Sequence, residues 1–135
     1  MSRSGYADEY SNWDLIIWRG AVASAIRGKR GQQFLVDLAA ALDAMPDKRL
    51  IAGALEYDGE YCALGALGEA RGLPVDKLDP EDSRQVAVAF DIADALAREV
   101  MYRNDEAGEY NETPEARWTR MRAWVESSLA QGGES

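Results

Sequence analysis

Two stripes of apolar side chains, one near each end of the chain, constrain the fold more than any other feature of the sequence. In both stripes the apolar residues follow one another at spacings of three, four and four positions. This pattern gathers side chains on one face of an α-helix, which turns once every ~3.6 residues. The stripes consist of Leu15, Trp18, Val22 and Ile26, and of Trp118, Met121, Val125 and Leu129. The sequence therefore predicts amphipathic helices close to both ends.

The first of these helices is predicted over residues 11–27, where Gly28 ends it. Ile16 and Ile17 widen its apolar stripe, so we expect this helix to lie centrally in the fold. A second helix is predicted from Gly31 to residue 45, because the residue before a proline avoids the helical region and Pro46 follows.

Small residues and helix caps define the later helices. Residues 62–72 form a small-residue helix that Gly72 ends. Asp79-Pro80 combines an N-cap with a proline at the first helical position and predicts the longest helix, which reaches about Arg103. Thr113-Pro114 opens the last helix in the same way.

Residues 49–64 are consistent with two structures. Asp58-Gly59 is a strong hairpin dipeptide, but Gly53 and Ala54 weaken a strand before it and favour a helix from Leu50 to Glu56. We therefore predict a mainly α, all-α single domain over residues 11–130. The expected architecture is a bundle of five or six helices, and one short β-hairpin near Asp58-Gly59 is the alternative left open by the sequence. A frayed N-terminal arm (1–10) and a disordered tail (131–135) flank it.

The chain has no histidine and a single cysteine, Cys62. These counts exclude His-based triads and a Cys/His zinc site, since neither set of side chains is present. Cys62 stands among small apolar residues and is interpreted as a buried hydrophobic residue. One thiol without a pairing partner indicates a reducing cytoplasm, and no apolar run is long enough to span a membrane.

Charge is distributed unevenly along the chain. Residues 1–53 carry seven basic and six acidic side chains (+1), and residues 54–135 carry eight and eighteen (−10), which gives the net charge of −9. An acidic surface repels nucleic acid and attracts basic partners. We therefore expect binding to a basic protein surface, with direct nucleic-acid binding disfavoured.

The strongest candidate for that contact is the acidic stretch 104–112, together with an aromatic residue of the last helix. Acidic side chains would meet the charge of a basic partner, and exposed aromatic residues mark interfaces. The predicted partner-binding residues are Asp105, Glu106, Glu109, Tyr110, Glu112 and Trp124.

Other sites are less well supported by the sequence. The acidic stretch lacks the ligand spacing of an EF-hand, so no metal site is predicted. Gly65, Gly68 and Gly72 do not form a nucleotide fingerprint, so no cofactor is predicted. Basic residues between the first two helices loosely suggest a helix-turn-helix, but the following helix is mostly apolar. No spacing isolates one carboxylate pair among the twenty-four acids, so no catalytic residue is assigned.

Four segments of the chain resemble a group of small, acidic, uncharacterised proteins of tailed phages and bacterial prophages. They are GAVASAIRGKRGQQFL (20–35), ALDAMPDKRLIA (41–52), GEYCALGALGEARG (59–72) and ETPEARWTRMRAWV (112–125). The resemblance covers most of residues 13–130. It implies a phage accessory protein that acts in the cytoplasm of a bacterial host. It transfers no residue roles, because the group has no assigned activity.

These features favour a non-catalytic protein that binds a host protein or nucleoprotein complex through an acidic surface. Small acidic phage proteins include inhibitors of host defence, such as anti-CRISPR proteins and DNA mimics. The main alternative is a homo-oligomeric structural or assembly protein of a phage, in which a homodimer is the simplest state. A DNA-binding regulator and a small carboxylate hydrolase are the further alternatives.

Overall fold

The computed structural model describes residues 12–132 and consists of six α-helices, one 3-10 helix and one two-stranded hairpin. The mainly α bundle with a short hairpin is thereby confirmed. The predicted N-terminal arm (1–10) lies outside the described residues. Of the predicted tail (131–135), Gln131 and Gly132 are described, and both belong to the last helix. The elements are α1 (Asn12–Arg27), α2 (Lys29–Ala44), β1 (Glu56–Tyr57), β2 (Glu60–Tyr61), α3 (Ala63–Ala70), η1 (Val75–Lys77), α4 (Ser83–Phe90), α5 (Asp94–Asp105) and α6 (Pro114–Gly132).

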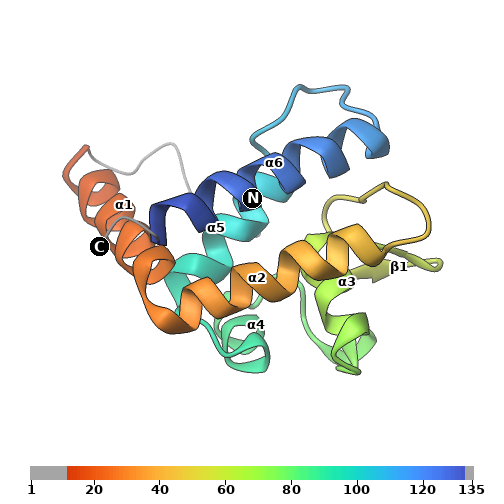
Figure 1. Cartoon of the computed structure of the whole chain (residues 1–135), viewed down its shortest axis with the longest axis horizontal. Coiled ribbons are helices and arrows are strands. Elements are labelled where there is room, and N and C mark those ends of the chain that lie inside the picture. The colour runs from red at the N-terminus through yellow and green to blue at the C-terminus, as the bar shows by residue number, and fades with distance from the viewer. Residues whose placement is uncertain (1–11, 133–135) are drawn as a thin grey trace.

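Helices α2 and α6 run antiparallel along the long axis of the molecule, with α1 at one end and the hairpin at the other (Figure 1). The Trp118 indole Nε1 donates to the carbonyl oxygen of Leu42 at 3.2 Å, which fixes one end of this pair. Gln32 donates to the carbonyl oxygen of Ser128 at 3.1 Å at the other end. Apolar side chains of α2, α3, α5 and α6 fill the space between the helices, and Leu35, Leu38 and Met121 are fully buried there.

The corner between α1 and α2 is tighter than expected, because α2 begins at Lys29 and only Gly28 separates the two helices. A glycine is required at position 31, where a β-carbon would lie 1.9 Å from the carbonyl oxygen of Ala25. Lys29 and Arg30 therefore belong to the first turn of α2 rather than to a separate basic turn.

The segment before α3 forms the hairpin, so the helix favoured over Leu50–Glu56 is wrong. Glu56 pairs with Tyr61 and Tyr57 with Glu60 in antiparallel register. Asp58 and Gly59 take φ values of 53° and 80°, the two positive values that a type I′ turn needs. The local Asp-Gly signal thus outweighed the small residues before it.

The single long helix predicted from Asp79 to about Arg103 is also wrong, because it is split into α4 and α5. The Asp82 side chain caps α4 by accepting from the Gln85 amide at 3.1 Å, whereas Asp79 accepts from the amide of Glu81 in the turn before. Asp91 then takes a left-handed conformation with φ 56° and ends α4. As a result α6, with 19 residues, is the longest helix.

Helix α1 is less central than its sequence suggests. Val22 and Ile26 are buried as predicted, but Ile16 and Ile17 are 61% and 54% exposed. These two side chains lie on the outward side of the helix, beside the exposed Trp13. The helix therefore has an apolar face that the described part of the chain does not cover.

Candidate binding pocket

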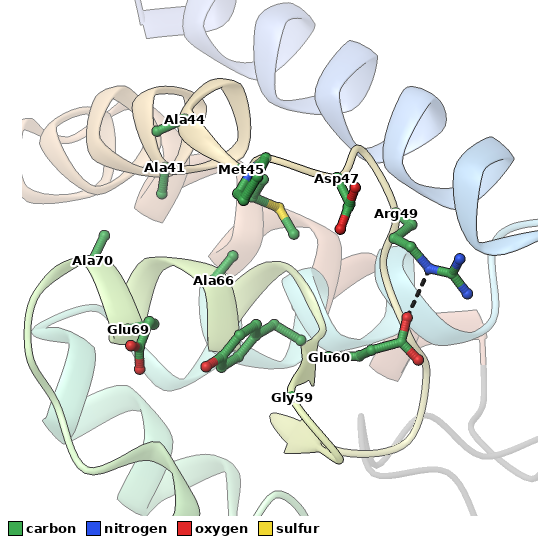
Figure 2. Close-up of a pocket in the computed structure, with 12 residues that line it drawn as sticks. Ala41, Ala44, Met45, Asp47, Arg49, Gly59, Glu60, Ala66, Glu69 and Ala70 are labelled. Atoms are coloured by element: carbon green, nitrogen blue, oxygen red, sulfur yellow. Dashed lines mark ion pairs between the residues drawn. The ribbon is translucent and has the colours of Figure 1, made fainter.

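A pocket of about 270 Å³ opens between the end of α2, the hairpin and α3 (Figure 2). Its floor consists mainly of alanine side chains from the two helices, and polar side chains of the hairpin and the connecting loop surround the opening. It is lined by Ala41, Ala44, Met45, Pro46, Asp47, Arg49, Gly59, Glu60, Tyr61, Ala66, Glu69 and Ala70.

Helix α3 has one face for packing and another for the pocket. A β-carbon at Gly65 would lie 1.8 Å from the carbonyl oxygen of Leu55, and one at Gly68 would lie 2.3 Å from Val75. These glycines allow the helix to pack directly against neighbouring segments. Ala66 and Ala70, spaced four residues apart on another face, leave the space that forms the pocket.

The pocket rim carries more negative than positive charge. Asp47, Glu60 and Glu69 contribute carboxylates, and Arg49 contributes the only guanidinium among the lining residues. Arg49 Nε lies 2.7 Å from Glu60 Oε1, and its Nη1 lies 3.3 Å from Glu115 at the start of α6. Because all of these side chains remain partly exposed, the rim presents a net negative edge to solvent.

Tyr61 is the aromatic residue among those that line the pocket. Burial raises the pKa of the Tyr61 hydroxyl above its ordinary value, and the charges of Glu69 and Glu56 and a hydrogen bond to Glu69 raise it further. Tyr61 therefore stays protonated at neutral pH, and its hydroxyl is the donor of the hydrogen bond to the Glu69 carboxylate.

The end of α2 is held firmly beside the pocket. Lys48 Nζ donates to the carbonyl oxygens of Asp43 at 2.5 Å and Met45 at 2.6 Å, which satisfies the last turn of the helix. The same ammonium group lies 5.6 Å from the centre of the Trp118 ring. Arg122 forms a two-pronged ion pair with Asp43 at 2.9 and 3.1 Å, and its hydrogen bonds lower the Asp43 pKa. The α2 side of the pocket is thus preorganised by α6.

The predicted partner-binding residues are divided by the structure into exposed and internal groups. Glu106, Glu109 and Tyr110 are exposed in the loop between α5 and α6, with Tyr110 fully so. Trp124 is half-buried against the core, with the Arg103 guanidinium 6.0 Å from its ring centre. Their role in binding stays a prediction.

The other two predicted residues hold the fold together. The Asp105 carboxylate accepts from the Gly53 amide at 3.2 Å and from Asn104 Nδ2 at 2.8 Å. The Glu112 side chain is only 8% exposed and lies 2.7 Å from Arg120 and 3.4 Å from Arg117. Hydrogen bonds from Arg120 and the charges of both arginines lower the pKa of Glu112 below its ordinary value.

The sequence predicts a polar loop at Asn104, but this residue is a buried part of the fold. It lies in α5, is 1% exposed, and its side chain accepts from the Ala63 amide at 3.1 Å and donates to the Ile51 carbonyl at 2.9 Å. Its carbonyl oxygen accepts from Arg117 at 2.9 Å. The available signal was its position four residues after Val100, on the buried stripe of the helix. We call Asn104, Glu112, Arg117 and Arg120 the Glu112 cluster.

Comparisons with known proteins yield no match to a family model, a curated protein or a solved structure. Within residues 12–132, no three Cys, Asp or Glu side chains are grouped so that they could hold a metal ion. None of the helices in this range combines the length and apolar character needed to cross a bilayer. The pocket and the exposed surfaces are therefore the features of this chain that bear on its function.

Proposed function

We propose that this chain is a non-catalytic binding protein that engages a basic surface of another protein, and that its pocket receives a Lys or Arg side chain of that partner. The observation that carries the proposal is the combination of an alanine floor with an acidic rim. A long basic side chain has the same two parts, an apolar stem and a cationic end.

The contacts in the pocket fit such a side chain. Ala41, Ala66 and Ala70 offer apolar surface to the methylene groups of the stem. Glu60 and Glu69 supply carboxylate oxygens for the cationic end, and the Tyr61 ring supplies an aromatic face. Pairing with a desolvated cation in a pocket is worth more than pairing on an open surface, because water screens the charges less.

The exposed part of the loop between α5 and α6 does not line the pocket, but it carries further negative charge that a basic partner could contact. Glu106, Glu109 and Tyr110 would extend an acidic contact surface toward a larger basic partner. The sequence resemblance to phage proteins points to a host protein or nucleoprotein complex in the bacterial cytoplasm as that partner. Inhibition of host defence, in the manner of anti-CRISPR proteins or DNA mimics, is the biological role that we propose on this basis.

A small probe tests the pocket directly. We would titrate the chain with the amide of N-acetyl-arginine and follow the backbone amide NMR signals of Tyr61, Ala66 and Ala70. A dissociation constant of about 1–10 mM is expected for so small a ligand. The amide of N-acetyl-citrulline has the same shape without the charge and is expected to bind at least tenfold more weakly, roughly the effect of losing 1.4 kcal/mol.

Two alanines of α2 provide a matched pair of variants. Ala44 lines the pocket and Ala40 does not, yet both are exposed. Ala44→Leu should fill the opening and remove binding of the arginine probe, while Ala40→Leu should leave it unchanged. Equal binding of the charged and neutral probes, or equal effects of the two variants, would contradict the proposed function.

Partner capture tests the larger role. Proteins retained from a bacterial lysate by the immobilised chain at low salt should be lost with Ala44→Leu and retained with Ala40→Leu. Retention should also fall steeply as salt rises from ~50 to ~500 mM, because exposed charges are screened over shorter distances. Retention that is insensitive both to salt and to the pocket variant would exclude an acidic docking surface.

A further inference from the structure

The outward face of α1 is a continuous apolar surface that the described part of the chain leaves uncovered. Trp13, Ile16 and Ile17 are 68%, 61% and 54% exposed. They lie on the side of the helix opposite the buried Val22 and Ile26. The same face continues through three small exposed residues, Gly20, Ala21 and Ser24. Exposed apolar surface of this kind is typical of interaction sites.

Gly20 is not explained by contacts among residues 12–132. It lies in the middle of a 16-residue helix, and a β-carbon added there would meet nothing within 4 Å. Alanine at an exposed helical position is more stable than glycine by roughly 0.5–1 kcal/mol. By contrast, Gly31 is required because a β-carbon there would lie 1.9 Å from a carbonyl oxygen. A glycine at position 20 would likewise be required if the backbone of another molecule lay as close to it as the Ala25 carbonyl lies to Gly31.

Charge along the chain indicates what that molecule is. The first turn of α1 carries an acidic residue, Asp14, and its last turn carries a basic residue, Arg27. When such a helix is paired with an antiparallel copy of itself, each acidic end meets a basic end, and the two helix dipoles also oppose one another. A parallel copy would bring like charges together.

We propose that α1 pairs antiparallel with α1 of a second copy of this chain, around a two-fold axis that passes near Gly20. In this register Ile16 faces Ser24 of the other copy, and Trp13 faces Arg27, whose guanidinium can lie over the indole ring. A helix of 16 residues is about 24 Å long, so the helix pair alone makes a small interface. The dimer therefore belongs to the weak, reversible class. This inference does not depend on the pocket.

Sedimentation equilibrium of the full chain, from about 10 µM to about 1 mM, tests the dimer. Ile17→Glu places a charge in the centre of the face and should raise the dimer dissociation constant about tenfold or more. Val88→Glu is the matched control, because Val88 is an apolar residue that is 82% exposed on α4. Far-UV circular dichroism and urea unfolding should be the same for both variants and the wild type, since neither side chain is buried.

Cysteine cross-linking tests the antiparallel geometry. Gly20→Cys places two thiols near the axis and should give a disulfide-linked dimer on mild oxidation. Trp13→Cys places the thiols seven residues from the axis in each copy, about 20 Å apart, which is too far for a disulfide. The wild type, whose only thiol is the buried Cys62, is the control and should stay monomeric on a denaturing gel.

Three results would overturn the proposal. The first is a strict monomer over the whole concentration range. The second is a dimer that Ile17→Glu and Val88→Glu affect equally, which would place the interface elsewhere. The third is cross-linking of both Trp13→Cys and Gly20→Cys, which would mean a parallel pair, because every residue of a parallel pair faces its own copy. A monomer whose α1 face is covered by residues 1–11 or by a different protein falls under the first result.

Discussion

The Glu112 cluster and the pocket rim both contain glutamates and arginines, but the two regions use them differently. In the Glu112 cluster the carboxylate is 8% exposed, and two arginines pair with it while also donating to backbone carbonyl groups. At the pocket rim, the Glu60 carboxylate is 42% exposed and is paired with an arginine that is equally open to solvent. One region is part of the interior, and the other is part of the surface.

This difference shows that acidic residues of one chain have to be divided by burial before any of them is assigned to binding. Removing a buried, fully paired carboxylate destabilises the fold because its arginines are left as unpaired charges, and such a carboxylate offers no charge to a partner. An exposed carboxylate contributes little to stability, because its pairs form in water, but its charge acts on other molecules. Substitutions in the Glu112 cluster should therefore change stability far more than substitutions at the pocket rim.

The largest effect is expected for Glu112→Ala. This change leaves Arg117 and Arg120 without their carboxylate partner in a largely buried environment and should lower the free energy of unfolding by about 3 kcal/mol. Urea unfolding measures it. Glu115→Ala is the control, because that carboxylate is 60% exposed and should change stability by at most about 0.5 kcal/mol. Equal effects of the two variants would remove the distinction between the regions.

Asn104→Ala should have the next largest effect, about 2 kcal/mol in the same urea experiment. The change leaves the Ala63 amide and the Ile51 carbonyl without their side-chain partner at the junction of α3, α5 and α6. Asn111→Ala in the adjacent exposed loop is the matched control and should be close to neutral. Loss of stability in the control but not in Asn104→Ala would contradict the assignment of Asn104 to the interior.

The pH dependence of stability should follow Glu112. Its pKa is lowered in the folded state from an ordinary value of 4.5, so the folded state holds this proton less tightly than the unfolded chain does. The stabilisation is therefore present above that value and is lost as pH falls through the folded pKa. Between about pH 6 and about pH 3 the wild type should lose more stability than Glu112→Gln. Parallel curves for the two proteins would mean that the ion pairs contribute nothing.

The smallest effect on stability is expected at the rim. Glu60→Gln combined with Glu69→Gln should change the free energy of unfolding by about 0.5 kcal/mol or less, since both side chains are partly exposed. The same double variant should weaken binding of the arginine probe severalfold, because Glu60 and Glu69 are two of the three carboxylates that line the pocket and are proposed to pair with the cationic end. Large destabilisation together with unchanged probe binding would reverse the roles of the two regions.

Much of the fold could be predicted from local patterns. The stripes of the first and last helices gave α1 and α6, and Thr113 caps α6 as its sequence suggested, by accepting from the Ala116 amide at 3.1 Å. The break at Asp91 was missed because aspartate in a left-handed conformation leaves a weaker signal than glycine does. The exposure of Ile16 and Ile17 could not be foreseen, since a helix with apolar residues on several sides does not specify which side packs.

The candidate site was less predictable than the fold. The pocket is formed by alanines, and an alanine on a helix gives no sign in the sequence that it lines a cavity rather than a close contact. Ala66 and Gly65 are neighbours in one helix, yet one lines the pocket and the other contacts a backbone carbonyl. Likewise, Glu106 and Glu112 lie in one acidic stretch, and only the position of α6 separates an exposed carboxylate from a buried one.

The sequence by itself determined α1, α2, α3 and α6, because their caps, breakers and apolar spacings act within a few residues of one another. It also determined the excess of acidic side chains and the absence of histidine chemistry. Only the tertiary structure decided which carboxylates became interior partners of arginine and which surround the pocket. Those outcomes depend on contacts between residues far apart in the chain, such as Arg122 with Asp43 and Arg117 with Leu50, and local spacing does not encode such contacts.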